Sequence, residues 1–150
     1  MAFNQDESSY TEHARRIPRP SHNFVPEYQM SGIPHVETRS LDTLAFNAGA
    51  RNIQATHKFS LGSVSRWIKI TCSAAGRLYF NKTAADTAAD THYYTLGANS
   101  TVRLELKCKE FYVMPDADAT IVSVIVGLTN VAAEDFPDQN SANGFLGVQA

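Results

Sequence analysis

The segment Arg51-Asn-Ile-Gln-Ala-Thr-His-Lys-Phe-Ser-Leu61 alternates between apolar and polar residues. The polar side chains of this segment fall mostly on even positions, and the apolar ones fall on odd positions, at Ile53, Ala55, Phe59 and Leu61. Successive side chains of a strand point to opposite faces, so the alternation predicts a strand with one dry face and one solvated face. It opens a run of similar short segments that continues to Leu128.

Six further segments carry a strand pattern and are separated by turn residues such as glycine, serine, proline and aspartate. We predict strands over 67–72, 77–81, 92–96, 101–109, 111–114 and 121–126. Regular short strands with turns between them are typical of sandwiches and barrels. The sequence therefore predicts an all-β fold, namely a jelly-roll-like β-sandwich of about seven or eight strands over residues 51–128.

Two extended arms are expected to flank this core. Residues 1–50 hold four prolines and scattered apolar residues without periodicity, which predicts an extended N-terminal arm that gains order on contact with another surface. Residues 129–150 are mostly polar and predict a C-terminal tail with a late apolar hook. The repeated Thr and Asp of residues 82–91 predict a loop with no buried face.

Composition narrows the function classes. The chain has 150 residues, 43% hydrophobic and 19% charged, which suits one globular core. A net charge of −2 provides no basic surface for nucleic acid, and no apolar run is long enough for a membrane span. The acidic residues Asp6 and Glu7 argue against a signal peptide at the N-terminus.

The sequence offers no catalytic, cofactor or metal motif, so we expect a protein that is not an enzyme. His57 has the apolar parity of its segment and reads either as a base or ligand or, preferably, as a hydrogen-bonded histidine at the core. Turn aspartates lack the dense spacing of a calcium loop. Cys72 and Cys108 point inward in predicted strands, as a disulfide or, preferably, as two buried thiols.

The segment 121–126, Ile-Val-Ser-Val-Ile-Val, is apolar on both parities. A two-layer sandwich covers only one face of each strand, so the second face needs an arm, a loop or another subunit. We expect a homo-oligomer, with a trimer preferred and a dimer as the alternative. The residues expected to bind partners are the arm anchors, an outward tryptophan and the tail hook: Phe24, Val25, Tyr28, Met30, Trp67, Phe145 and Leu146.

Three segments resemble a pattern of small virion proteins of tailed bacteriophages: Gly76–Asn81, Thr91–Ser100 and Glu110–Ile125. They combine a short strand before an Ala/Thr-rich loop, a strand entering a Gly-Ala-Asn-Ser turn, and a Pro-Asp-Ala-Asp turn before an apolar strand. The resemblance spans roughly residues 66–128. It implies a jelly-roll-like capsid cement or decoration protein that binds the major capsid protein, in a virion assembled in the host cytoplasm.

A second interpretation is a carbohydrate-binding or receptor-binding sandwich on a tail or fibre. Sandwich folds host such sites, and aromatic rings supply stacking surfaces for sugars. The residues that would form the platform are Trp67, Tyr79, Tyr93 and Tyr94.

Overall fold

The computed structural model describes residues 33–47, 49–86 and 91–145. Strands dominate these ranges, and the helical segments are short. The strands are β1 (Ile33–Leu41), β2 (Lys58–Ser60), β3 (Ser63–Cys72), β4 (Gly76–Tyr79), β5 (Tyr94–Leu96), β6 (Ser100–Leu104), β7 (Glu110–Pro115) and β8 (Thr120–Ala132). The helical segments are η1 (Ala55–His57), α3 (Lys82–Asp86), η2 (Ala133–Asp135) and η3 (Ser141–Asn143).

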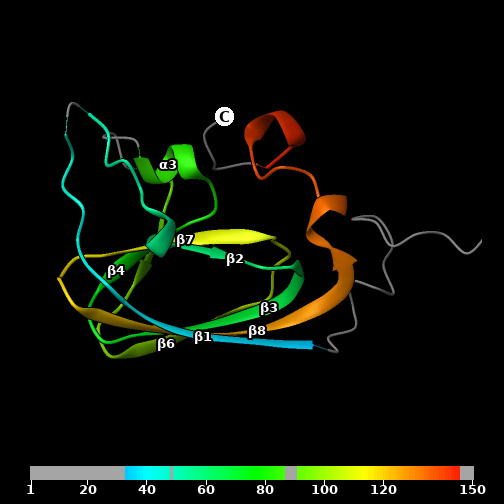
Figure 1. Ribbon diagram of the computed structural model, residues 1–150, viewed down its shortest axis with the longest axis horizontal. Coiled ribbons are helices and arrows are strands. Elements are labelled where there is room, and N and C mark those ends of the chain that lie inside the picture. The colour runs from blue at the N-terminus through cyan, green and yellow to red at the C-terminus, as the bar shows by residue number, and fades with distance from the viewer. Residues whose placement is uncertain (1–32, 48, 87–90, 146–150) are drawn as a thin grey trace, which may run out of the picture.

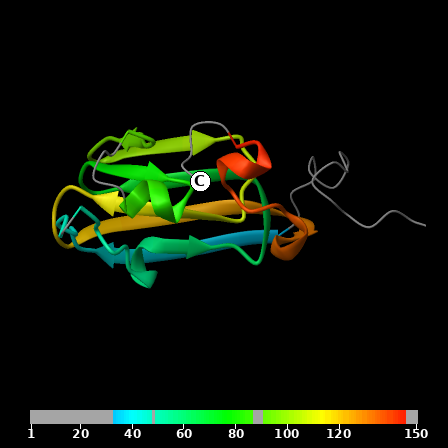
Figure 2. The ribbon, with the colours of Figure 1, turned by 90° about the horizontal axis from the view of Figure 1, so that it is seen from above.

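The strands form two four-stranded antiparallel sheets that lie face to face (Figure 1). One sheet has the order β1-β8-β3-β6 and the other the order β2-β7-β4-β5. Seen from the side of α3, the long strands of both sheets run along one common direction (Figure 2). The all-β class predicted from the alternating segments is confirmed.

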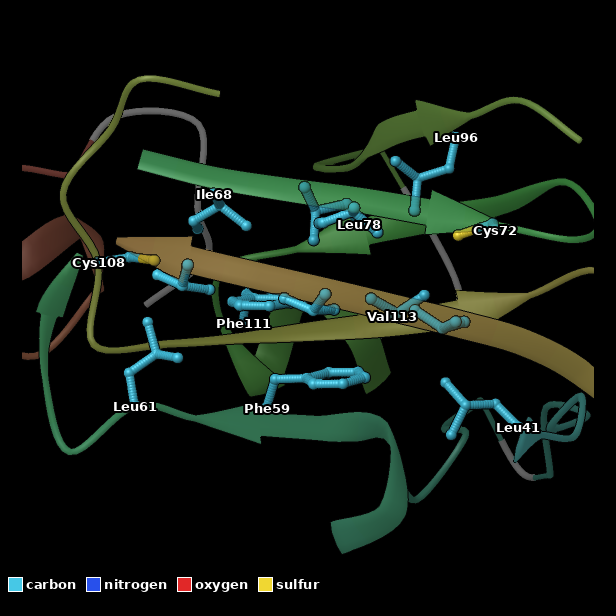
Figure 3. Close-up of a cluster of buried hydrophobic side chains, with 14 of the residues drawn as sticks. Leu41, Phe59, Leu61, Ile68, Cys72, Leu78, Leu96, Cys108, Phe111 and Val113 are labelled. Carbon is cyan, nitrogen blue, oxygen red and sulfur yellow. The ribbon is translucent and has the colours of Figure 1, made fainter. Parts of the chain in front are cut away.

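The main core fills the space between the sheets (Figure 3). It is built from inward positions of both sheets, such as Ile68 of β3 and Val113 of β7, which are fully buried. Phe59 of β2 stacks on Phe111 of β7 with ring centroids 5.1 Å apart. Burial of these apolar side chains is the main force that holds the two layers together.

Cys72 and Cys108 lie at opposite ends of this core (Figure 3). Both are buried, and neither forms a disulfide. Burial raises the pKa of the Cys72 thiol to about 11. Burial, with a smaller contribution from the charge of Glu110, raises the pKa of Cys108 to about 12. The preferred interpretation of the two cysteines as buried thiols is confirmed.

The structure corrects the N-terminal boundary of the core, because β1 lies inside the segment predicted to be an arm. It pairs with β8 along its whole length, from Ile33 opposite Leu128 to Leu41 opposite Thr120. Alternation was hidden because β1 turns three charged or titratable side chains toward the sandwich: His35, Glu37 and Arg39. Inward charges are common on edge strands, where they discourage pairing with other chains.

Arg39 explains how such a charge is accommodated at the opening between the edge strands β1 and β2. Its guanidinium lies 4.5 Å from the ring centroid of Phe59. The same group donates hydrogen bonds to the backbone carbonyls of Thr56 and Lys58 at 2.8 and 2.7 Å, and it forms an ion pair with Glu37. The side chain therefore joins the two sheets at this edge.

Two predicted strands are shorter than their sequence patterns. Residues 51–54 have no regular structure, and residues 55–57 form η1, so that only Lys58–Ser60 form a strand. His57 is 2% exposed, and its Nε2 lies 2.8 Å from the carbonyl oxygen of Asp42, which confirms the hydrogen-bonded interpretation. Likewise β6 ends at Leu104, so the alternation continues to residue 109 outside a strand.

The prediction that residues 82–91 bury nothing is wrong. Residues 82–86 form α3, whose Ala84 and Ala85 are buried against the outer side of the β2-β7-β4-β5 sheet. The side chain of Asn81 accepts a hydrogen bond from the backbone amide of Ala84 at 3.2 Å and caps the helix. Alanine is small enough to let one helical turn lie flat on a sheet, a packing that sequence periodicity does not reveal.

The predicted tail also begins too early. β8 continues to Ala132, and Val131 packs with Val64 and Phe136 in a satellite core. Gln139 is only 5% exposed, and its side chain bonds to backbone groups of Phe80 in one segment and of Lys109 and Glu110 in another. Residues 129–145 are therefore an integral part of the domain.

Candidate interaction surface

The outer faces of the two sheets differ, and this difference locates the candidate site. The outer face of the β2-β7-β4-β5 sheet is covered by α3 and the segment before η1, which bury Tyr79, Tyr112 and Met114. Figures 1 and 2 show α3 and η3 on this side of the molecule. This covering explains why β7 is buried on both faces.

The outer face of the β1-β8-β3-β6 sheet is not covered by any element of the described ranges (Figure 1). We call it the open face. Its exposed large apolar side chains are Val36, Ile121 and Ile125, which are 68%, 45% and 37% exposed. Val36 and Ile125 are directly paired across β1 and β8, so their side chains are neighbours on one surface. Adjacent exposed apolar side chains on a sheet indicate an interaction surface.

A row of hydroxyl groups crosses the open face between Ile121 and Ile125. It consists of Thr38, Ser123, Thr71 and Thr101, one from each strand, in direct register. The hydroxyl oxygens of Thr38 and Ser123 are 3.0 Å apart, and those of Thr71 and Thr101 are 2.8 Å apart. Hydroxyls can both donate and accept, so this row can bond to a partner without a fixed charge.

Basic side chains occupy the β3 and β6 side of the open face. Lys69 lies opposite Ile125 on one side and Arg103 on the other. Arg103 forms an ion pair with Glu105 at 2.8 Å, whereas Lys69 makes no ion pair or hydrogen bond within the part of the chain that the structure describes. A shallow groove of about 250 Å³ runs between Val36, Lys69 and Ser123. This groove presents an apolar wall and one cation.

Trp67 is the one sequence-predicted site residue that lies on the open face. It is paired with Gly127, so no side chain lies directly opposite it on β8, and it is half-buried. The guanidinium of Arg103 lies 4.6 Å from the centroid of the ring. The outward orientation predicted from parity is therefore confirmed, while its role as an interface anchor stays a prediction.

The remaining predicted site residues are distributed as follows. Phe24, Val25, Tyr28, Met30 and Leu146 lie outside the described residues. Phe145 packs on its own chain, with its ring centroid 5.7 Å from that of Phe136. A second groove, of about 420 Å³, lies beside Phe145 and is lined also by Phe80 and Leu106.

The four aromatic residues predicted to form a sugar platform do not lie on one exposed surface. Tyr79 is fully buried under α3, and Trp67 belongs to the other sheet. Tyr93 and Tyr94 are exposed, and the ring centroid of Tyr93 lies 6.0 Å from that of the buried Tyr79 and 5.1 Å from the guanidinium of Arg77. The predicted platform is therefore wrong. Strand parity indicates which side chains share a face, but it does not indicate which outer face of the sandwich another part of the chain covers.

The described residues contain no group of three histidine, cysteine or acidic side chains that could hold a metal ion. Two Thr–His contacts, Thr56 with His57 and Thr91 with His92, join sequence neighbours at 3.2 Å. The second ring nitrogen of His57 faces the carbonyl of Asp42 rather than a carboxylate that could orient it as a base. In the described ranges no helix is long and apolar enough to cross a membrane.

The sequence patterns predicted three of the four strands of the open face, β3, β6 and β8, and missed β1. The two-sided apolar pattern of residues 121–126 identified β8 correctly. Val36 and Thr38 were placed in the arm, although their alternation with inward charges was a usable signal. Comparisons of the chain with protein-family models, curated proteins and solved structures find no match.

Proposed function

We propose that the chain is a structural virion protein without enzymatic activity, a cement or decoration protein that binds the major capsid protein shell. The observation that carries this proposal is the open face, on which Val36, Ile121 and Ile125 are exposed beside a hydroxyl row. A chain that buries one sheet face under its own helix and leaves the other uncovered has a surface suited to assembly. Virion assembly in the host cytoplasm is the corresponding location.

The finer fold we propose is a jelly roll. β1 pairs with β8, β2 with β7, β3 with β6 and β4 with β5, as in an antiparallel ribbon of four strand pairs rolled into two layers. The contacts of β3 with β8 and of β4 with β7 then close each sheet. Viral capsid domains and lectins are among the proteins that use this architecture. The strand order thus supports a virion role without selecting it over sugar binding.

The proposed contacts are the open face with Trp67, the arm anchors Phe24, Val25, Tyr28 and Met30, and the tail hook Phe145 and Leu146. The chain is proposed to form a homo-oligomer, with a trimer preferred and a dimer as the alternative. Arms that reach neighbouring subunits stabilise a shell because linked contacts raise one another's effective concentration.

Copy number in purified virus particles tests the function. Quantitative mass spectrometry of particles that contain this chain should find it in hundreds of copies, as expected for a shell protein. A handful of copies would place it on a neck, tail or fibre, and absence from the particles would refute the virion role.

Truncation tests the arm. A deletion of residues 1–32 keeps β1 intact, whereas a deletion of residues 1–50 would also remove an edge strand of the sandwich. The 33–150 protein should fold and lose most of its affinity for shells that lack the chain, measured by co-sedimentation. Undiminished binding of the folded truncation would refute the arm model.

The second candidate function is carbohydrate or receptor binding. It is favoured by the exposed ring of Tyr93, which lies beside Arg77, and by the exposed ring of Tyr94 on the edge strand β5. A glycan array would support it if binding is seen and is lost in Tyr94→Ala. No signal at high protein concentration would remove it.

A further inference from the structure

We infer that the open face of one copy receives residues 24–30 of a neighbouring copy, so that the oligomer forms by exchange of N-terminal segments. This inference rests on the homo-oligomer of the proposed function and names its contact. The receiving surface is the open face defined above, with Val36, Ile125 and Lys69 around its groove.

The size of the open face argues against direct pairing of two such faces. Four strands about 4.8 Å apart, over the nine paired residues of β1 and β8, give a face of roughly 19 by 26 Å. Two copies placed face to face would bury about 1,000 Å² in total, below the roughly 1,200–2,000 Å² of stable interfaces. A different occupant is therefore required.

The segment Phe24-Val-Pro-Glu-Tyr-Gln-Met30 matches the open face in length and pattern. Seven extended residues span roughly 23 Å, close to the length of the face. Phe24, Pro26, Tyr28 and Met30 share one parity and would present an apolar side to Val36 and Ile125. The hydroxyl of Tyr28 can reach the hydroxyl row, and proline at 26 favours packing on the face over insertion as a central strand.

The occupant suggested by length and pattern is thus the segment 24–30. Glu27 has the opposite parity and would point away from the open face.

The length of the linker between the segment and β1 determines whether the segment can cover its own sheet or must cover that of a neighbouring copy. Only Ser31 and Gly32 separate Met30 from Ile33, the first residue of β1. To cover its own sheet, the segment would have to lie about 10 Å above it, the distance between packed layers, and the chain would have to reverse its direction. The three residue steps from Met30 to Ile33 span about 10 Å at full extension, so no length remains for the reversal. Short hinges of this kind favour exchange between copies.

Disulfide trapping in the full-length protein tests the inference. The Tyr28→Cys and Ile125→Cys double variant should form covalent oligomers under mild oxidation, seen on non-reducing gels. The native thiols of Cys72 and Cys108 are buried and should not compete. The matched control combines Tyr28→Cys with Thr95→Cys, an exposed position on the edge strand β5, and should form at least tenfold less product.

Each alternative result overturns the inference. A cross-link confined to the monomer would mean that the segment covers its own sheet. Equal products in both double variants, or none in either, would mean that the segment does not prefer the open face.

Sedimentation of the free protein adds a second readout. Ile125→Glu and the 33–150 truncation should both raise the dissociation constant of the oligomer at least tenfold, while Thr95→Glu should leave it unchanged. Circular dichroism checks that each variant is folded. A monomeric wild type, or an oligomer that persists in both variants, would contradict the exchange. Because no shell is present, these results are separate from the copy-number test of the virion role.

Discussion

Replacement of Gln139 by alanine should destabilise the domain more than any other change at an uncharged polar residue of the C-terminal segment. The side-chain amide of Gln139 donates to the carbonyls of Phe80 and Glu110 at 2.7 and 2.9 Å. Its oxygen accepts from the backbone amides of Lys109 at 2.7 Å and Glu110 at 3.4 Å. One side chain thus serves the end of β4 and the start of β7.

The magnitude follows from these contacts. The three bonds of 2.9 Å or less each contribute about 1 kcal/mol net, so Gln139→Ala should cost about 3 kcal/mol. A domain of this size has roughly 5–15 kcal/mol in total, so the loss is a large fraction of its stability. The melting temperature should fall by about 6–12 °C.

Urea denaturation and calorimetry of the two proteins measure this loss. Asn143→Ala is the matched control, because its side chain makes an exposed bond to the carbonyl of Asp138 at 3.0 Å and should cost less than about 1 kcal/mol. A loss below about 1 kcal/mol for Gln139→Ala would refute the reasoning, since it would mean that water satisfies the exposed backbone groups equally well.

Three further predictions concern the contacts of Arg39, the dependence of stability on acid pH and the reactivity of the thiols. Arg39→Met should lower the free energy of unfolding, measured in urea, by about 1–2 kcal/mol, because the backbone carbonyls of Thr56 and Lys58 lose a hydrogen-bond donor at a partly exposed site. An unchanged free energy of unfolding would contradict the role of Arg39 in joining the two sheets. Partial burial tends to raise the pKa of Glu37, but the hydrogen bond and charge of Arg39, with His35, outweigh it and lower the pKa overall. The hydrogen bonds from Thr43 lower the pKa of Asp118. Both pKa values lie below those of the unfolded chain, so stability should be constant above about pH 5 and fall as the pH drops through the folded values, measured by urea titration from pH 6 to 2. At pH 8 a colorimetric thiol reagent should react slowly with the native protein and fast with both cysteines after unfolding, because the thiol pKa values are about 11 and 12; a rapidly reacting native thiol would contradict their burial.

The amino-acid sequence alone determined the fold class and the centre of one sheet. Alternation over residues 67–72 predicted most of β3, and the two-sided apolar pattern of residues 121–126 predicted β8 as a central strand. Burial of Cys72 followed from the same parity. These features are local, since side-chain direction in a strand depends only on position along the chain.

Only the tertiary structure decided where the domain begins and ends. Inward charges at 35, 37 and 39 are tolerated because β1 is an edge strand, where Arg39 reaches carbonyls of another segment. Gln139 is buried at a position where its side chain bonds to the backbone carbonyls of Phe80 and Glu110. Neither contact has a sequence signal, because each joins residues that are distant along the chain.

The candidate interaction surface is also decided by the tertiary structure. Alternation shows that a strand has two faces, but it does not show which outer face another part of the chain covers. Ala84 and Ala85 bring α3 onto one sheet, and the other sheet leaves Val36 and Ile125 exposed. The open face is therefore a property of how the two layers and one short helix pack, since exposure depends on contacts between elements and not on the pattern within any one strand.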